Sequence, residues 1–347
     1  MKRLLKKNLI FYLLLFFFSA EYSLRFLGFG YNVQPINESS SNHHEHPKNF
    51  KFRAYEPNGE WGNFTINFDN YGNRIIKNIC KKENSEYSSR IILLGDSFIE
   101  GIQVSDENSV GGLLQKEYCE KELKVINLGV TSYSPVLSFI QLFNQIQKNP
   151  DLIIKNSVLI HFLSGNDLED DNYYSKKIET INKGGIVYPV INSKKNNPLL
   201  KIISRKSYFV RLIRRIILTI KVKVSDIFYD KKFQKSGNLF NSFDKCKINA
   251  KEINTTKIYL NKINKLVNKE GGKYFVTAIP HDPKKREITN YPCFKKISEE
   301  LNIKFIESPN VFFNNPSIYY FDKDLHLNKE GNKVLSNKII KYLKNFL

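Results

Sequence analysis

Three short polar segments carry side chains suited to chemistry on an acyl group. They are Gly95-Asp96-Ser97, Asn127-Leu128-Gly129 and Ser164-Gly165-Asn166-Asp167, and each stands at the end of a mostly apolar run. A serine on a turn between a buried strand and a helix is a candidate nucleophile. Taken singly, such residues are more often turn or helix-capping residues. Their occurrence at three successive strand ends favours one shared site.

The two later segments offer donors for a developing oxyanion. Gly129 has no side chain, so its backbone N–H can approach a substrate oxygen, and the Asn166 carboxamide can donate to the same atom. The N–H of Ser97 would be a third donor. Loss of one such donor typically costs about 10²–10³ in kcat. We therefore predict an oxyanion hole formed by Ser97, Gly129 and Asn166.

A base for the serine is predicted near the C-terminus. His326 lies just before a helix-length stretch, and Asp324 precedes it by two residues. A carboxylate at that distance can fix the imidazole tautomer and stabilise the imidazolium. His281 also follows a strand-like run and is the competing base, whereas His161 lies inside such a run and is expected in the core. The predicted catalytic set is Ser97, His326 and Asp324.

The elements that position these residues alternate between strands and helices. Runs that are mostly apolar, typical of strands covered on both faces, lie at 90–95, 125–129, 157–163, 274–279 and 303–306. Helix-length stretches lie at 109–123, 135–147, 253–270 and 330–347. This alternation predicts an α/β fold with a parallel sheet and right-handed crossovers. In such a sheet, the site forms at the carboxyl ends of the strands.

The motifs, in this order, resemble the SGNH (GDSL-type) hydrolase superfamily, in a membrane-anchored bacterial form, from about residue 90 to the C-terminus. The resemblance implies a flavodoxin-like three-layer α/β/α domain with a central parallel sheet of about five strands. It also implies a Ser-His-Asp mechanism on acyl esters, with no metal or other cofactor. It matches Ser97 to the nucleophile, Gly129 and Asn166 to oxyanion donors, and His326 to the base.

Two positions depart from the superfamily pattern. The orienting aspartate commonly stands three residues before the histidine, where this chain has Lys323; Asp324 fits a variant spacing, and Asp322 is the fallback. A glycine is usual two positions before the asparagine of the third motif, where this chain has Ser164. The serine at position 164 affects the expected shape of the turn more than the expected role of Asn166 as a donor.

The first 31 residues have the charge order of an export signal. Basic side chains within residues 2–7 precede the apolar run Leu9–Phe18, which is shorter than the roughly 20 residues of a full span. Extending the run buries Glu21 and Arg25, and residues 18–20 match a cleavage site poorly. We predict an uncleaved signal-anchor rather than a cleaved signal. The positive-inside rule then places the rest of the chain on the periplasmic or cell-surface side.

Three parts are expected along the chain: a signal-anchor or transmembrane segment over 1–31, a linker with a small β element over 32–89, and the hydrolase-like domain over 90–347. The run 43–46, His-His-Glu-His, lies in the linker, and a solvated segment explains it better than a metal site. An insertion over about 168–250 shows no clear strand. Within it, 198–224 is a basic amphipathic helix that packs on the core, caps the active site or lies on an anionic membrane.

Charge and cysteine content bear on which partners and metal sites the chain could have. The net charge is +20, but lysine supplies most of it and no nucleic-acid module is recognisable, so we predict no nucleic-acid partner. The four cysteines, Cys80, Cys119, Cys246 and Cys293, are far apart and form no CxxC pair, which argues against a zinc site. Two disulfides in any of three connectivities and buried free thiols both remain open.

We therefore predict a membrane-tethered serine esterase. It would remove acyl groups, often acetyl in this superfamily, from envelope or extracellular glycans or similar small esters. An O-acyltransferase with the same residues is the first alternative, with a sugar hydroxyl in place of water. A catalytically silent scaffold in polysaccharide assembly is the second. Acceptor choice depends on the dryness of the pocket and the shape of a lid, so the sequence does not separate hydrolase from transferase.

Overall fold

The computed structural model describes residues 2–27, 36–56, 59–77, 87–192, 207–229, 246, 250–280 and 291–347. The chain forms two compact units. We call Met1–Pro35, Phe52–Asn63 and Lys194–Asn238 the anchor unit, and Ile36–Lys51, Phe64–Ser193 and Leu239–Leu347 the sheet unit.

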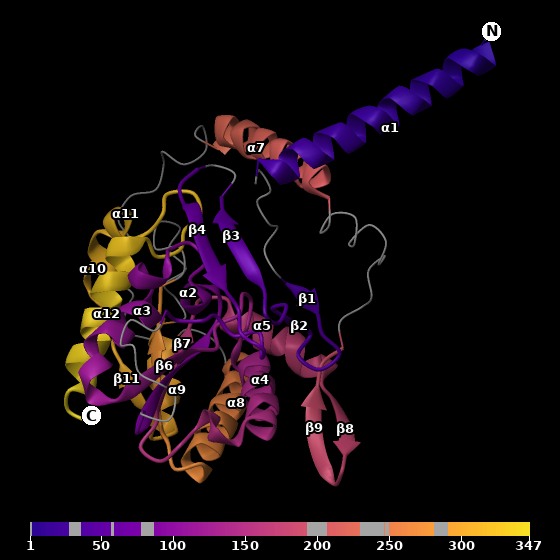
Figure 1. The fold of residues 1–347 in the computed structure, drawn as a ribbon. Helices are drawn as coiled ribbons and strands as arrows, with labels where there is room; N and C mark the ends of the chain where they lie inside the picture. The colour runs from indigo at the N-terminus through magenta and orange to yellow at the C-terminus, as the bar shows by residue number, and fades with distance from the viewer. Residues whose placement is uncertain are drawn as a thin grey trace. The chain divides into compact units, whose positions relative to one another are not determined.

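A sheet of five parallel strands forms the centre of the sheet unit, and its strands β6, β7 and β11 are labelled in Figure 1. The five strands are β5 (Ser89–Gly95), β6 (Leu123–Asn127), β7 (Val158–Leu163), β10 (Lys273–Ala278) and β11 (Lys304–Ile306), in the order β11-β10-β7-β5-β6. In β5, Leu93 lies beside Asn127 of β6 and Ile160 of β7. The strands that end at the three predicted motifs are therefore neighbours.

Successive side chains of these strands enter two different apolar layers. Ile91 and Leu93 face one layer, with α3 (Val110–Glu117) and α12 (Lys329–Leu343). Ile92 and Leu94 face the other, with α4 (Pro135–Lys148), α8 (Ala250–Lys269) and α9 (Tyr291–Glu300). All four strand residues are fully buried, and burial of each such side chain stabilises the fold by about 1.5–3 kcal/mol. The predicted three-layer α/β/α architecture with five parallel strands is confirmed.

Short elements connect the main ones. The short α-helices are α2 (Ser97–Glu100), α5 (Asp167–Tyr174), α10 (Val311–Asn314) and α11 (Pro316–Tyr319). The single 3₁₀ turns are η2 (Asp106–Asn108), η3 (Cys119–Lys121), η4 (Pro150–Leu152) and η5 (Ser175–Lys177).

The insertion, whose sequence shows no clear strand, nevertheless contains a β-hairpin, which corrects that expectation. β8 (Glu179–Lys183) pairs antiparallel with β9 (Ile186–Val190) around Gly184 and Gly185, whose φ angles are +60° and +83°. Two glycines with positive φ are a strong hairpin signal. Every residue of β8 is exposed, so the strand carries no apolar periodicity. Of the predicted basic helix, α7 (Tyr208–Tyr229) covers the later part, and 198–206 lies outside the described residues.

The segment before the sheet is packed rather than a free linker. Strand β1 (Asn37–Glu38) pairs with β2 (His44–Glu45), and β3 (Lys51–Tyr55) pairs with β4 (Gly62–Asn67). Residues 36–51 belong to the sheet unit. Asn42 is buried and its side-chain oxygen accepts a hydrogen bond of 2.8 Å from Asn144 of α4. The expectation of a solvated tether is therefore corrected from residue 36 onward, because buried polar contacts hold the segment.

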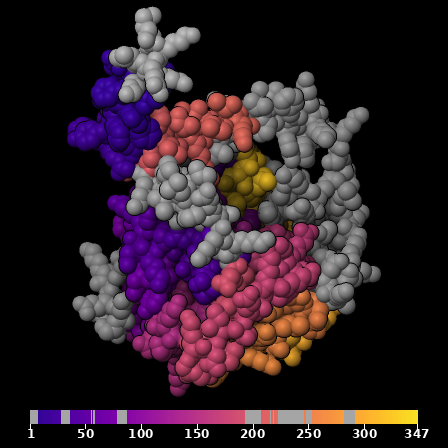
Figure 2. All heavy atoms as spheres, turned by 90° about the vertical axis from the view of Figure 1, so that its right-hand side faces the viewer, coloured from indigo at the N-terminus to yellow at the C-terminus, as the bar shows by residue number. Residues whose placement is uncertain are grey.

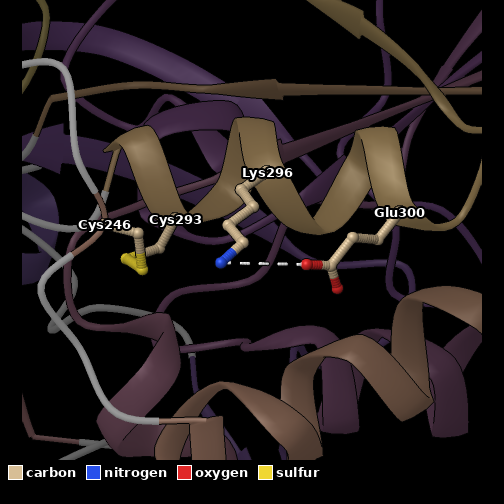
Figure 3. Close-up of a disulfide and its surroundings, with 4 residues drawn as sticks. All are labelled: Cys246, Cys293, Lys296 and Glu300. Carbon is tan, nitrogen blue, oxygen red and sulfur yellow. Dashed lines mark ion pairs between the residues drawn. A yellow bond between two sulfur atoms is a disulfide. The ribbon is translucent and has the colours of Figure 1, made fainter.

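A disulfide joins Cys246 to Cys293 at the start of α9 (Figure 3). One turn further along the same helix, Lys296 Nζ lies 4.0 Å from Glu300 Oε1. Cys119 is disulfide-bonded as well, and Cys80 lies outside the described residues. The alternative of buried free thiols therefore does not hold for Cys119, Cys246 and Cys293.

The first helix, α1 (Lys2–Phe26), is the candidate membrane segment. Its stretch Asn8–Phe26 is long and apolar enough to cross a membrane, and none of it is buried in the structure. Its 19 residues span about 28 Å as a helix, close to the roughly 30 Å of a bilayer's hydrocarbon core. A signal sequence would meet the same description.

Candidate active site

Ser97, His326 and Asp324 form a continuous hydrogen-bonded chain. Ser97 Oγ lies 2.7 Å from His326 Nε2, and His326 Nδ1 lies 2.7 Å from Asp324 Oδ1. The serine and the histidine are 229 positions apart in the sequence, so only the tertiary fold brings them together. With Nδ1–H donating to the carboxylate, Nε2 carries a lone pair toward the hydroxyl, which is the tautomer that a general base needs.

The turn after β5 fixes the place of Ser97. Gly95 has a φ of +152°, and a Cβ there would lie 2.6 Å from the carbonyl oxygen of Phe162. Asp96 then caps α2 by accepting a hydrogen bond of 3.0 Å from Phe98 N. A side chain at position 95 would push β5 and β7 apart, so glycine is needed two residues before Ser97.

A second tight turn fixes His326. Leu325, between Asp324 and His326, has a φ of +67°, a left-handed conformation that costs a side-chain-bearing residue about 1–3 kcal/mol. Two residues after His326, Asn328 caps α12 by accepting a hydrogen bond of 3.0 Å from Gly331 N. The His326 ring also packs on Phe98, with ring centroids 4.7 Å apart. The loop that carries His326 is thus held both by α12, which follows it, and by Phe98.

The surroundings of His326 shift its pKa upward overall. Burial by itself lowers this pKa, but the hydrogen bond and negative charge of Asp324, together with the charge of Asp96, more than offset it. The side chain of His326 is 21% exposed, so the pair is partly shielded from solvent. A carboxylate so placed stabilises the imidazolium that forms when the ring takes a proton.

Gly129 lies at the site, but its N–H is used within the protein. It donates a hydrogen bond of 2.8 Å to Asn127 Oδ1, and Asn127 in turn donates to the carbonyl of Ile99 at 2.7 Å. A Cβ at position 129 would lie 2.3 Å from Glu100 N, so this glycine lets the loop after β6 pack against α2. Its predicted donation to a substrate oxygen stays a prediction, and it requires Asn127 to release that N–H.

The third motif is tied to the first through Ser164. The Ser164 hydroxyl lies 2.6 Å from Asp96 Oδ2 and 2.7 Å from Asn166 Oδ1. Asn166 Nδ2 donates to Asp170 at 2.7 Å, and its second hydrogen leaves the predicted oxyanion contact chemically possible. Burial, with the nearby charge of Asp96, raises the pKa of Asp167 well above its usual range. The Ser164 hydroxyl thus links the ends of β5 and β7.

The histidine run of the N-terminal segment contacts the loop after β6. His44 Nε2 lies 2.7 Å from the carbonyl oxygen of Thr131, and Tyr133 Oη donates to the carbonyl of His44. Burial lowers the pKa of His44 to about 4, so the ring is neutral and donates through Nε2–H. Sequence reasoning missed this role, because the polar run 43–46 has no apolar periodicity that would predict packing.

His46 and Glu100 form a second buried contact beside the nucleophile helix. His46 Nε2 lies 3.4 Å from Glu100 Oε1, and both side chains are fully buried. Burial raises the pKa of the Glu100 carboxyl to about 8. The His46 ring stacks on Phe68 with centroids 4.2 Å apart. The run 43–46 therefore supports the sheet unit, and among the described residues no group of three or more His, Cys, Asp or Glu could hold a metal ion.

Arg74 is another contributor that sequence reasoning missed. Its guanidinium is buried and donates to the carbonyls of Glu100, Gly101 and Val104, which lie at and beyond the end of α2. It also pairs with Asp106 at 2.8 Å. These bonds fix the C-terminal end of the short helix that begins with Ser97.

The fold is similar to those of several solved structures. TesA matches with a TM-score of 0.43 and 11% identity over 75% of this chain and 100% of that chain. The psychrotrophic esterase EstA from Pseudoalteromonas sp. matches with 0.40 and 12% identity over 74% and 97%. A lipolytic protein of the G-D-S-L family from Desulfitobacterium hafniense matches with 0.41 and 11% identity over 73% and 98%. No protein-family model and no curated protein matches the sequence.

His281, the competing base, and residues 32–35 of the predicted linker lie outside the described residues. His161 is fully buried in β7, with Nδ1 2.8 Å from the hydroxyl of Tyr274. Burial lowers its pKa to about 3, which keeps the ring neutral.

Proposed function

We propose that this chain is a serine hydrolase of acyl esters in the SGNH (GDSL-type) superfamily. The observation that carries the proposal is the unbroken chain from Ser97 Oγ through the His326 ring to Asp324, with both contacts at 2.7 Å. A hydroxyl, an imidazole and a carboxylate in this order are what nucleophilic acyl transfer requires.

In the proposed reaction, Ser97 Oγ attacks the acyl carbon while His326 Nε2 takes the hydroxyl proton. The carbonyl electron pair moves onto the oxygen and then returns, breaking the bond to the leaving alkoxide, which takes the proton from Nε2. A water molecule next attacks the acyl-enzyme and gives a proton to Nε2. Return of this proton to Ser97 Oγ releases the carboxylic acid. Asp324 stabilises the imidazolium in both halves of the reaction.

The N–H of Ser97 and the Asn166 carboxamide are the proposed donors to the oxyanion, together with the Gly129 N–H once Asn127 releases it. The proposed substrate is an acyl ester, often an acetyl ester in this superfamily, on an envelope or extracellular glycan or a similar small molecule. The proposed location is membrane-anchored, with the sheet unit on the extracytoplasmic side. Support for the anchor is the exposed apolar helix Asn8–Phe26 and the basic residues before it.

Hydrolysis of p-nitrophenyl acetate by the full chain in detergent tests this proposal. Ser97→Ala and His326→Ala should each lower kcat by at least about 10³-fold, because members of such a triad act as a unit. Ser88→Ala is the matched control, since Ser88 is exposed at the opposite end of β5 from the nucleophile, and it should keep full activity. A fluorophosphonate should label wild type at Ser97, read by peptide mass spectrometry, and should leave Ser97→Ala unlabelled.

The outcomes separate the alternatives. Equal activity in wild type, Ser97→Ala and His326→Ala would contradict the enzymatic role. The catalytically silent scaffold would then be the remaining hypothesis. If the triad variants lose activity, a sugar acceptor is added to wild type and the products are analysed. Acyl-sugar formed in preference to free acid would assign the same residues to a transferase.

A further inference from the structure

Helix α7 of the anchor unit carries an apolar stripe that is open to solvent. Ile213, Ile216, Ile217 and Ile220 are 42%, 47%, 49% and 56% exposed. At about 100° per residue they fall within an arc of roughly 100°, so they form one continuous face. Four isoleucines exposed together on one helix are unfavourable in water and mark a docking surface.

The stripe begins where α7 meets α1. Phe209, one turn before Ile213, falls on the same arc at about 100° per residue. Its ring packs edge-on against Phe17 and Phe16 of α1, with centroids 5.2 Å and 6.1 Å apart. Figure 2 shows α7, in salmon, against the indigo α1. The apolar face of α7 is thus continuous with the exposed apolar surface of the candidate membrane helix.

The junction is fixed by the acidic residue that a membrane span would otherwise have to bury. The Glu21 carboxylate accepts hydrogen bonds from Ser207 Oγ at 2.8 Å, from Tyr208 N at 3.0 Å and from Phe209 N at 2.8 Å. It also pairs with Arg25 at 2.7 Å. These contacts satisfy the first amides of α7, and they compensate the cost of carrying a charge toward the bilayer.

The charge of α7 matches an anionic surface. Its sequence contains five Lys and Arg residues and one acidic residue, Asp226. Arg214 and Lys221 are both exposed and, at about 100° per residue, both flank the same edge of the isoleucine stripe. Basic residues beside an apolar face are typical of helices that lie in the headgroup region of a membrane.

We propose that α7 is an interfacial helix that inserts its isoleucine stripe into a lipid surface with anionic headgroups, next to the point where α1 leaves the bilayer. The inference rests on the membrane anchoring included in the proposed function and is independent of the esterase chemistry. Glu21 then joins a spanning helix to one lying on the surface, which sets the anchor unit at the membrane by two segments rather than one.

Tryptophan quenching in lipid vesicles tests the depth of α7. The full chain with Trp61→Phe carries either Ile217→Trp, on the stripe, or Thr219→Trp, about 200° away around the helix. Both proteins are placed in phosphatidylcholine vesicles with or without phosphatidylglycerol, with lipids brominated in the upper part of the acyl chain. Because an interfacial helix buries its apolar face about 5–10 Å deep, Ile217→Trp should be quenched at least about twofold more than Thr219→Trp. The difference should be larger with phosphatidylglycerol.

Each contrary result has a distinct meaning. Alkaline carbonate extraction of the same vesicles reports on α1, and p-nitrophenyl acetate hydrolysis reports on the site. A chain that stays in the membrane with neither tryptophan quenched overturns the interfacial role alone, and α7 then covers protein or a second copy, which cross-linking would show. Equal quenching with and without phosphatidylglycerol overturns the anionic preference. A chain removed by carbonate overturns the anchor, whatever the activity.

Glu21→Gln tests the junction with the stripe left intact. A neutral amide weakens the capping of α7 and the pair with Arg25 but changes no apolar residue. Quenching of Ile217→Trp should decrease in this background while carbonate resistance is kept. Unchanged quenching would show that Glu21 does not position α7 at the membrane.

Discussion

Substitution of Asp324 by Asn is the sharpest test of the proposed site, because it changes one charge and almost no volume. Asp324 Oδ1 lies 2.7 Å from His326 Nδ1, so the ring donates to a charged acceptor. Hydrogen bonds to charged groups contribute about 1.5–3 kcal/mol. If the amide oxygen takes the place of the carboxylate, loss of about 1.5–3 kcal/mol of imidazolium stabilisation lowers kcat about 13- to 160-fold.

A larger loss follows if the amide turns its NH₂ group toward the ring. The histidine then has to accept at Nδ1 and carry its proton on Nε2, facing Ser97 Oγ, where it has no lone pair for the hydroxyl proton. Such a wrong tautomer costs about 10⁴-fold in kcat in the serine protease template. The expected range for Asp324→Asn is therefore about 10- to 10⁴-fold, with a small change in KM.

The assay is kcat and KM for p-nitrophenyl acetate across pH, with Asp322→Asn as the matched control. Asp322 is the fallback acid two residues earlier, and its substitution should change kcat by less than about threefold if it lies outside the triad. In Asp324→Asn the acid limb of the profile should also move to lower pH, because the carboxylate that raises the pKa of His326 is gone. Full activity in Asp324→Asn with a large loss in Asp322→Asn would refute the assignment of the orienting acid.

Four further results are expected. Wild-type kcat should fall as pH drops through the raised pKa of His326, since the base must be neutral, and an acid limb below that of free histidine, about 6.5, would contradict this. His44→Ala should lower kcat about fivefold, the equivalent of about 1 kcal/mol for one hydrogen bond, with partial recovery in His44→Gln, measured as kcat separately from KM. Gly129→Ala should lower the free energy of unfolding by about 1–3 kcal/mol in urea titration, because a Cβ there meets the backbone of α2. Removal of the Cys246–Cys293 disulfide, which closes a loop of 47 residues, should lower the free energy of unfolding by about 4 kcal/mol in guanidinium titration. An unchanged free energy of unfolding would contradict the loop-entropy reasoning.

The alternation of strands and helices follows from patterns that lie close together in the sequence. Strands β5 and β7 are buried at nearly every position, so most of their side chains are apolar and each strand can be recognised by itself. The hairpin β8–β9 was not predicted, because all of β8 is exposed and only Gly184 and Gly185 indicate a turn in the sequence. Local hydrophobic pattern therefore reports burial, and an exposed strand has no such pattern.

The amino-acid sequence by itself determined which groups are available for chemistry and the order in which the strands present them, since Ser97, Asn166 and His326 each follow or precede a recognisable element. The tertiary structure alone decided that the Gly129 N–H bonds to Asn127, that Arg74 and His44 support the site, and that Glu21 caps α7. These contacts join polar residues that are distant in the chain or hidden in turns. Hydrogen bonds depend on distance and direction in space, so they leave no periodic pattern in the sequence. Burial of strands and helices does leave such a pattern, because the apolar residues recur on the buried face.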